Sequence, residues 1–101
     1  MEKQDALAAL AALAQETRLD VFRALVVAGP RGLTPGALSQ ALGISPATLS
    51  FHLKELKNAG LAHPERRGRS LVYRADFATM QAVVAYLLEN CCRDGGCAPN
   101  S

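Results

Sequence analysis

Apolar residues recur at helical spacing along the first third of the chain. The alanine-rich segment 5–14 is predicted to form a first helix, whose regularly spaced apolar residues are Leu7, Leu10 and Ala14. A second helix is expected to begin at Thr17, because Asp20 follows three residues later as in a capping box. The Gly-Pro pair at 29–30 predicts the end of this helix, and its apolar face comprises Leu19, Phe22, Leu25 and Val26.

Two short helices joined by a tight turn are predicted in the middle of the chain. Thr34 and Ser45 are each followed by proline, which pairs an N-cap residue with the residue suited to the first helical position. Gly43 can adopt the left-handed conformation that ends the first of these helices, and Gly60 marks the end of the second. The two form a helix-turn-helix, and the second helix is expected to bury Leu49, Leu53 and Leu56.

The apolar periodicity changes after residue 60. Segments 61–66 and 70–75 are predicted to pair as a two-stranded hairpin, or wing, that turns at Arg67 and Gly68. Asp76 is expected to cap a last helix with the apolar spacing of a helix that packs on a partner helix, carried by Phe77, Met80, Val84, Leu87 and Cys91. The fold class is therefore mainly helical: a winged helix-turn-helix with five helices and a hairpin between the fourth and the fifth.

Length and composition fit one domain. The chain has 101 residues, 50% of them apolar, and we expect a folded domain over residues 1–92 with a flexible tail over 93–101. No apolar run reaches the roughly 18 residues of a membrane span, and the acidic first five residues do not resemble a signal peptide. The cysteines all lie within the last eleven residues, which suits reduced thiols. We therefore expect a cytoplasmic protein with no membrane partner.

Basic charge is concentrated in one stretch. The chain carries a formal charge of +2, but residues 54–74 contain six basic and two acidic side chains, so this stretch carries +4 and the remainder −2. A polyanion-binding surface is typically basic in this way, although a solvated charged surface gives the same pattern. A turn of about 100° per residue places small and polar residues opposite the leucines of the fourth helix. The expected DNA contacts are Ala47, Thr48, Ser50, Phe51, Lys54 and Lys57 on this helix and Arg66, Arg67 and Arg69 around the wing turn.

Each of these side chains has an expected role. Thr48 and Ser50 can hydrogen-bond bases or phosphates, while the lysines and the wing arginines suit phosphates or the minor groove. Phe51 either packs against a thymine methyl or turns sideways into the core. His52 lies toward the core side of the helix, which favours a structural hydrogen bond over titration, and His63 has no evident function.

A single module of this size would bind DNA weakly, so we expect a homodimer. The residues assigned to its interface are Leu7, Leu10, Phe77, Met80, Val84 and Leu87. Two recognition helices would then meet half-sites about one helical turn, roughly 34 Å, apart. The double-stranded operator is expected to be an imperfect inverted repeat.

Four stretches of the sequence resemble one family along nearly the whole chain. They are residues 16–22 in the second helix, 49–56 in the recognition helix, 59–61 after it, and 67–69 with Tyr73 in the wing. Together they resemble the ArsR/SmtB family of metal-responsive winged-helix repressors. The resemblance implies a homodimer, without enzymatic activity, that represses a resistance operon until a metal or metalloid releases it from the operator.

The three cysteines indicate the ligand. Residues 33–42 contain no cysteine and residues 77–90 no histidine, so two kinds of metal site known in the family are not expected. Cys91, Cys92 and Cys97 instead resemble a subgroup of arsenic sensors with thiols at the end of the last helix. Trivalent arsenic and antimony suit three thiolates, whereas structural zinc normally has four ligands. Adjacent helical residues point about 100° apart, so Cys91 and Cys92 can share one ion only if the helix frays there.

Several alternatives remain open. Cys91 could be a buried core thiol, and a disulfide between Cys92 and Cys97 could make the protein a redox or sulfur sensor. A site selective for methylated trivalent arsenic is a further possibility. A thiol enzyme is not expected, because no general base or phosphate loop accompanies the cysteines. A winged helix used only for protein contacts is disfavoured by the basic stretch. No resident cofactor is expected, and the effector would be As(III), with Sb(III) as a second candidate.

Overall fold

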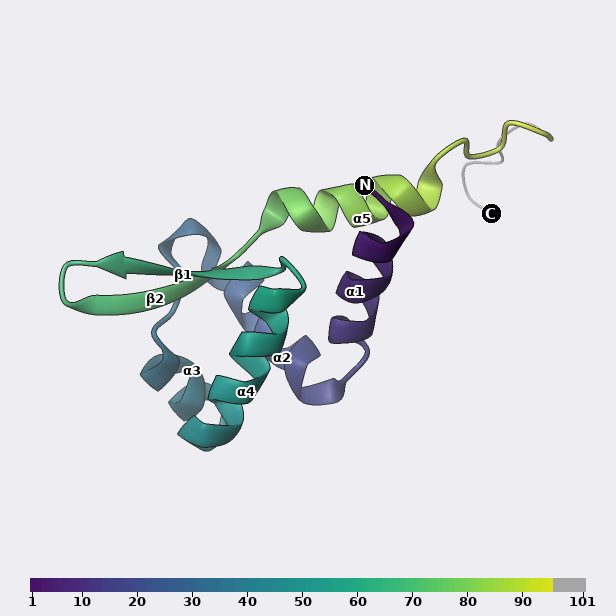
Figure 1. Ribbon diagram of the computed structural model, residues 1–101. Coiled ribbons are helices and arrows are strands. Elements are labelled where there is room, and N and C mark those ends of the chain that lie inside the picture. Colours follow the sequence, from purple (N-terminus) through teal and green to yellow (C-terminus); the bar gives the residue numbers. More distant parts are fainter. Residues whose placement is uncertain (96–101) are drawn as a thin grey trace.

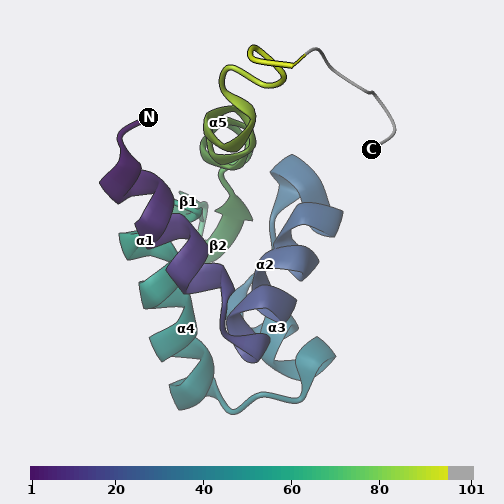
Figure 2. The same ribbon diagram turned by 90° about the vertical axis from the view of Figure 1, so that its right-hand side faces the viewer.

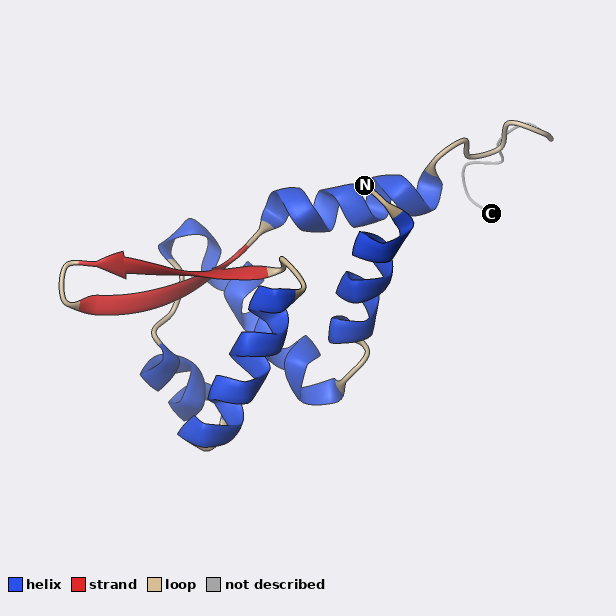
Figure 3. Ribbon diagram, viewed as in Figure 1, coloured by secondary structure: helices blue, strands red, loops and turns tan. Residues whose placement is uncertain are grey.

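The computed structural model describes residues 1–95 (Figure 1, Figure 3). Five helices, one short 3-10 helix and one antiparallel hairpin follow each other along the chain, and the described segments are α1 (Lys3–Leu13), α2 (Glu16–Ala28), η1 (Gly29–Arg31), α3 (Pro35–Leu42), α4 (Pro46–Asn58), β1 (Ala62–Arg67), β2 (Ser70–Ala75) and α5 (Phe77–Leu88). This order confirms the predicted winged helix-turn-helix. None of the helices within residues 1–95 is long and apolar enough to cross a membrane.

Side-chain caps fix most of the helix starts. Thr34 Oγ1 accepts a hydrogen bond from Ala37 N at 3.1 Å, and Ser45 Oγ accepts one from Thr48 N at 3.3 Å, as the sequence predicts for α3 and α4. The N-cap residue of α2 is Gln15, whereas the sequence predicted Thr17. Gln15 Oε1 accepts from Arg18 N at 2.8 Å, so the helix begins one residue before Thr17, whose side chain is not the cap.

The core lies where α2, α3 and α4 meet the base of the hairpin. Its largest fully buried side chains from these elements are Val21, Leu25, Leu38, Leu49, Leu56 and Leu61, and α5 adds Val83. The core face of α2 is narrower than predicted, because Leu19 and Val26 are 41% and 40% exposed. The buried residues of helix α1 are all small, namely Ala6, Ala9 and Ala12, and Leu13 at its end packs partly buried against the core.

The hairpin projects away from the helices, and α5 runs along the opposite side beside α1 (Figure 1, Figure 2). Strands β1 and β2 pair from Ala62 with Ala75 to Arg67 with Ser70. The turn therefore consists of Gly68 and Arg69, one residue later than predicted. Gly68 has a φ of 62°, and glycine is the residue that tolerates this conformation best at the first position of a two-residue turn.

Helix α5 ends earlier than the sequence predicts. Leu88 is its last residue, and the chain continues in turns through Asn90 and Cys92, whose φ angles are 61° and 64°. Asparagine adopts the left-handed region more readily than most residues, which favours leaving the helix at this point. Cys91 therefore lies beyond the helix and does not continue its apolar row. The rest of the predicted tail, including Cys97, lies outside the described residues from position 96 onward.

Candidate DNA-binding surface and cysteine site

The helix-turn-helix is held by a tight connection between α3 and α4. Gly43 adopts the left-handed conformation with φ 66° and ψ 34°, which turns the chain at the end of α3. The hydroxyl of Ser39 then donates to the carbonyl of Ile44, and Ile44 N donates to Ser39 O at 3.1 Å. Because both ends of the turn are hydrogen-bonded to α3, the start of α4 is fixed in direction.

Helix α4 separates its leucines from its polar residues. Leu49, Leu53 and Leu56 are at most 2% exposed, and they anchor the helix in the core. All six side chains assigned to DNA contact on this helix are exposed: Ala47, Thr48, Ser50, Phe51, Lys54 and Lys57. Phe51 is 55% exposed, so the interpretation that it packs into the core is wrong. Its ring makes an edge contact with His52 at a centroid distance of 5.4 Å.

His52 connects the recognition helix to the junction of α1 and α2. Arg18 Nε donates to Ala12 O at 2.8 Å, and Arg18 Nη1 lies 3.5 Å from His52 Nδ1. The imidazole is 7% exposed, which agrees with the predicted structural role. Burial lowers the pKa of His52 below its usual value, and the Arg18 charge lowers it further, so the neutral ring is the stable form.

The three arginines around the wing turn differ in their hydrogen bonding. Arg66 and Arg69 are exposed, and within residues 1–95 they make no hydrogen bond or ion pair. Arg67 Nη1 donates to Arg31 O at 2.6 Å, and Arg67 Nη2 donates to Pro30 O and Glu65 Oε1, both at 2.8 Å. The hydrogen bond from Arg67 lowers the pKa of Glu65 below its usual value. The wing therefore offers two unengaged guanidinium groups near its tip.

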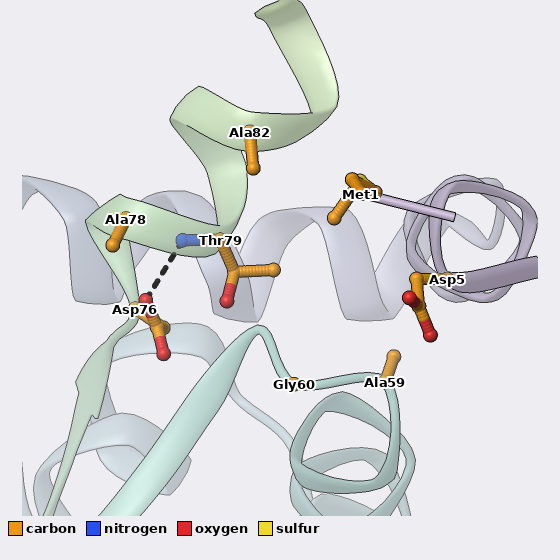
Figure 4. Close-up of a pocket in the computed structure, with 8 residues that line it drawn as sticks. All are labelled: Met1, Asp5, Ala59, Gly60, Asp76, Ala78, Thr79 and Ala82. Atoms are coloured by element: carbon orange, nitrogen blue, oxygen red, sulfur yellow. Dashed lines mark hydrogen bonds between the residues drawn. The ribbon is translucent and has the colours of Figure 1, made fainter. Parts of the chain in front are cut away.

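The base of the wing is linked to the start of α5. His63 Nε2 lies 2.7 Å from Asp76 Oδ2, while Asp76 Oδ1 accepts from Thr79 N at 2.8 Å as the cap of α5. The Thr79 amide is the main cause of the lowered pKa of Asp76. A pocket of about 480 Å³ lies beside this cap, between the N-terminal end of α1, the turn after α4 and the first turns of α5 (Figure 4). The sequence assigned no role to His63, although the hairpin register places it opposite Arg74 and so diagonally across from position 76.

Two cysteine sulfurs meet just beyond α5. Cys91 Sγ and Cys92 Sγ are 3.1 Å apart, and Cys91 is exposed. Cys92 is half-buried and disulfide-bonded, so the expectation that the cysteines are all reduced is wrong in this structure. The two side chains converge because the chain has left the helix. This departure from helical geometry is the condition under which, as predicted from the sequence, the two cysteines can share one ion. Among residues 1–95, no three His, Cys, Asp or Glu side chains are grouped as a metal site would need. A three-thiol site therefore needs Cys97, which lies outside the described residues.

An apolar surface extends over α1 and α5, and we name it the α1–α5 face. Five of the six side chains assigned to the dimer interface are at least 37% exposed on it: Leu7, Leu10, Phe77, Val84 and Leu87. Met80, the sixth, is partly buried and packs against the core. Leu88 is 60% exposed and was missed, because the predicted row continues from Val84 through its neighbour Leu87.

Known proteins match both the sequence and the arrangement of these elements. A family model described as a helix-turn-helix domain matches residues 13–67, more than half of the chain. HlyU from Vibrio cholerae N16961 is 30% identical over 91% of this chain and 99% of that chain, with a TM-score of 0.69. The ArsR-like transcriptional regulator from Rhodococcus sp. RHA1 is 29% identical over 86% of this chain and 78% of that chain, with a TM-score of 0.76. The chain belongs to the ArsR/SmtB family.

Membership of the ArsR/SmtB family makes the chain a DNA-binding transcriptional regulator, and it confirms the prediction that the protein is not an enzyme. A further similar structure, the AntR antimony-specific transcriptional repressor, is 28% identical over 85% of this chain and 77% of that chain, with a TM-score of 0.66. No curated protein matches the sequence. Within the ArsR/SmtB fold, α4 is the recognition helix and the hairpin is the wing.

Proposed function

We propose that the protein is a homodimeric repressor that leaves its operator when trivalent arsenic or antimony binds Cys91, Cys92 and Cys97. The observation that carries this proposal is the 3.1 Å separation of the Cys91 and Cys92 sulfurs immediately beyond α5. The similarity to AntR, which is described as an antimony-specific repressor, supports a soft trivalent ligand.

The exposed face of α4 enters the major groove. Small side chains at its start, such as Ala47 and Ser50, allow close approach to the base edges. Thr48 lies beside Ser45, whose hydroxyl is 3.0 Å from Thr48 Oγ1, so both hydroxyls lie at the end of the helix that reaches the DNA first. Phe51 packs on a thymine methyl, while Lys54, Lys57, Arg66 and Arg69 bind phosphates.

A second copy of the chain covers the α1–α5 face. Leu87 and Leu88 are 58% and 60% exposed, and Leu7 adds a 51% exposed side chain from α1. Large apolar side chains exposed on neighbouring helices are typical of an interface between subunits. The dimer places two α4 helices on half-sites roughly 34 Å apart, and the operator is an imperfect inverted repeat.

The donor set suits a trivalent metalloid. Thiolates are soft ligands, and As(III) or Sb(III) takes three of them, whereas a tetrahedral zinc site takes four ligands. Two sulfurs are already adjacent, and Cys97 supplies the third once the disulfide at Cys92 is reduced. Because only Glu89 and Asn90 separate Leu88 from Cys91, ligand binding at the sulfurs changes the end of the helix that forms the dimer. Coupling free energies of about 1 to 3 kcal/mol are typical, so the ligand should weaken operator binding about 5- to 150-fold.

The test is an operator-binding titration in reducing buffer with arsenite, antimonite, zinc and cadmium in separate arms. We expect arsenite and antimonite to release the DNA. Cys92→Ser should bind the operator as the wild type does and should not respond to arsenite. Val27→Ser, at an 83% exposed position on α2, serves as the control and should keep the arsenite response.

Three outcomes would contradict parts of this function. A response to zinc alone, or a full arsenite response in Cys92→Ser, would exclude the three-thiol metalloid site. Release only by an oxidant such as a peroxide, with no arsenite response under reduction, would make the protein a thiol redox sensor. Release by methylated trivalent arsenic alone would indicate a two-thiol site.

A further inference from the structure

The base of the wing is attached to the segment between α2 and α3. Leu33 N donates to Tyr73 O at 3.0 Å, and Tyr73 N donates to Leu33 O at 2.8 Å. Gly32 approaches so closely that a Cβ atom there would stand 2.5 Å from Tyr73 O. Residues 29–33, which we call the 29–33 segment, therefore hold the hairpin at Tyr73, opposite Pro64.

The same segment holds the hairpin a second time, near its tip. The two amino groups of Arg67 donate to the carbonyl oxygens of Arg31 and Pro30. Arg67 pairs with Ser70, three residue pairs beyond Pro64 and Tyr73, so the two attachments are about 10 Å apart along the hairpin. The attachment at Tyr73 and the buried Ala62 and Ala75 hold only the base of the hairpin. The attachment at Arg67 restrains its outer half, and so it sets the angle at which the wing tip leaves the protein.

Arg67 differs in this respect from its basic neighbours. Its positive charge is balanced by Glu65, whose Oε1 also lies 3.3 Å from Arg74 Nε. A guanidinium can span two carbonyls and a carboxylate because its donors form a planar fork, and the ammonium of lysine cannot. Arg66 and Arg69 lack such partners within residues 1–95, so they are the wing arginines available to phosphates.

We propose that Arg67 is a positioning residue for DNA binding. It fixes the angle of the wing, so that Arg66 and Arg69 reach the DNA backbone, and it does not contact DNA itself. This role rests on the proposed binding of the wing to the operator.

Operator affinities of variants of the full chain test the proposal. Arg67→Lys keeps the charge but loses the fork, and we expect it to weaken binding about fivefold, as Arg67→Gln does. Arg69→Lys is the matched control and should stay within about twofold of the wild type, because an ammonium still binds a phosphate. In the Arg66→Gln/Arg69→Gln background, Arg67→Gln should change the affinity by less than about twofold, since no wing contact is left to position.

A direct phosphate contact gives a different pattern. Arg67→Lys would then bind nearly as the wild type does. Arg67→Gln would lower the slope of log affinity against log salt by about one unit in every background. Either result overturns the proposal. An affinity of the Arg66→Gln/Arg69→Gln protein equal to that of the wild type would also overturn it, because the wing would then make no contribution to binding.

Hydrogen exchange of the DNA-free protein measures the attachment itself. Arg67→Lys should speed exchange of the Leu33 and Tyr73 amides by at least about threefold, and Arg69→Lys should leave both rates unchanged. Equal rates in the two variants would overturn the positioning role even if operator binding were normal. If the wild-type chain showed no salt-dependent DNA binding, the proposed function would be refuted too. If the wild type binds DNA and only the predictions for the Arg67 variants fail, the positioning role alone is refuted.

Discussion

Replacing Gly32 with alanine tests the close approach between the 29–33 segment and the wing. Gly32 has φ 68° and ψ −176°, a region that is essentially restricted to glycine, and a residue with a Cβ pays about 1–3 kcal/mol there. The new Cβ would also stand 2.5 Å from Tyr73 O, so the wing backbone must move. Such overpacking adds about 1–3 kcal/mol. We expect Gly32→Ala to lower the free energy of unfolding by about 2–6 kcal/mol, a large share of the stability of a small domain.

Gly29→Ala is the matched control for this variant. Gly29 has φ 71° and ψ −153°, close to the conformation of Gly32, but nothing lies within 4 Å of its added Cβ. It therefore carries the conformational cost without the collision. Urea unfolding followed by circular dichroism, at one protein concentration, should show Gly32→Ala to be less stable than Gly29→Ala by about 1–3 kcal/mol. Stabilities within about 0.5 kcal/mol of each other would refute the argument that Tyr73 O is the obstacle.

Three further predictions concern pH, DNA and assembly. Because the folded state lowers the pKa of His52, its contribution to stability is complete above the ordinary value of 6.5 and is lost as the pH falls below it. The loss between pH 7.5 and 5.5 should be at most about 1.4 kcal/mol, and His52→Gln should remove it in urea unfolding measured at the two pH values. Phe51→Ala should weaken operator binding about fivefold or more while changing stability by less than about 0.5 kcal/mol, and equal operator affinity would exclude a role for this ring in recognition. Leu87→Glu should give a folded monomer in analytical ultracentrifugation, whereas Val27→Glu, at an 83% exposed position on α2, should sediment as the wild type does.

The order of the elements could be predicted from the sequence because each boundary has a local cause. Thr34, Ser45 and Asp76 cap their helices with their own side chains, and Gly43 supplies the left-handed turn. The division of α4 into a buried and an exposed face follows from helical periodicity alone. These features depend on residues within about one helical turn of each other. Both partners of each contact therefore lie in the same short stretch of sequence, where the pattern shows them.

The features that could not be predicted depend on residues distant in the sequence. Arg67 is drawn to carbonyl oxygens of η1, more than thirty positions away, and nothing in the wing sequence distinguishes it from Arg66 or Arg69. The link between His63 and Asp76 requires the exact register of the hairpin, which was predicted with a turn displaced by one residue. The end of α5 was placed too late, because Cys91 fits the apolar spacing although the chain has already left the helix.

The alanine face of α1 has a consequence for the way the protein tolerates dilution and mutation. Ala6, Ala9 and Ala12 bury three methyl groups against the core, a gain of only about 2–3 kcal/mol, while Leu7 and Leu10 face outward. Leu13 at the end of the helix also packs partly against the core, so the helix obtains part of its stability from its own subunit. In the proposed dimer the outward leucines supply the rest. Substitutions of the outward leucines should therefore reduce the abundance of the regulator in a cell before they alter any contact with its operator.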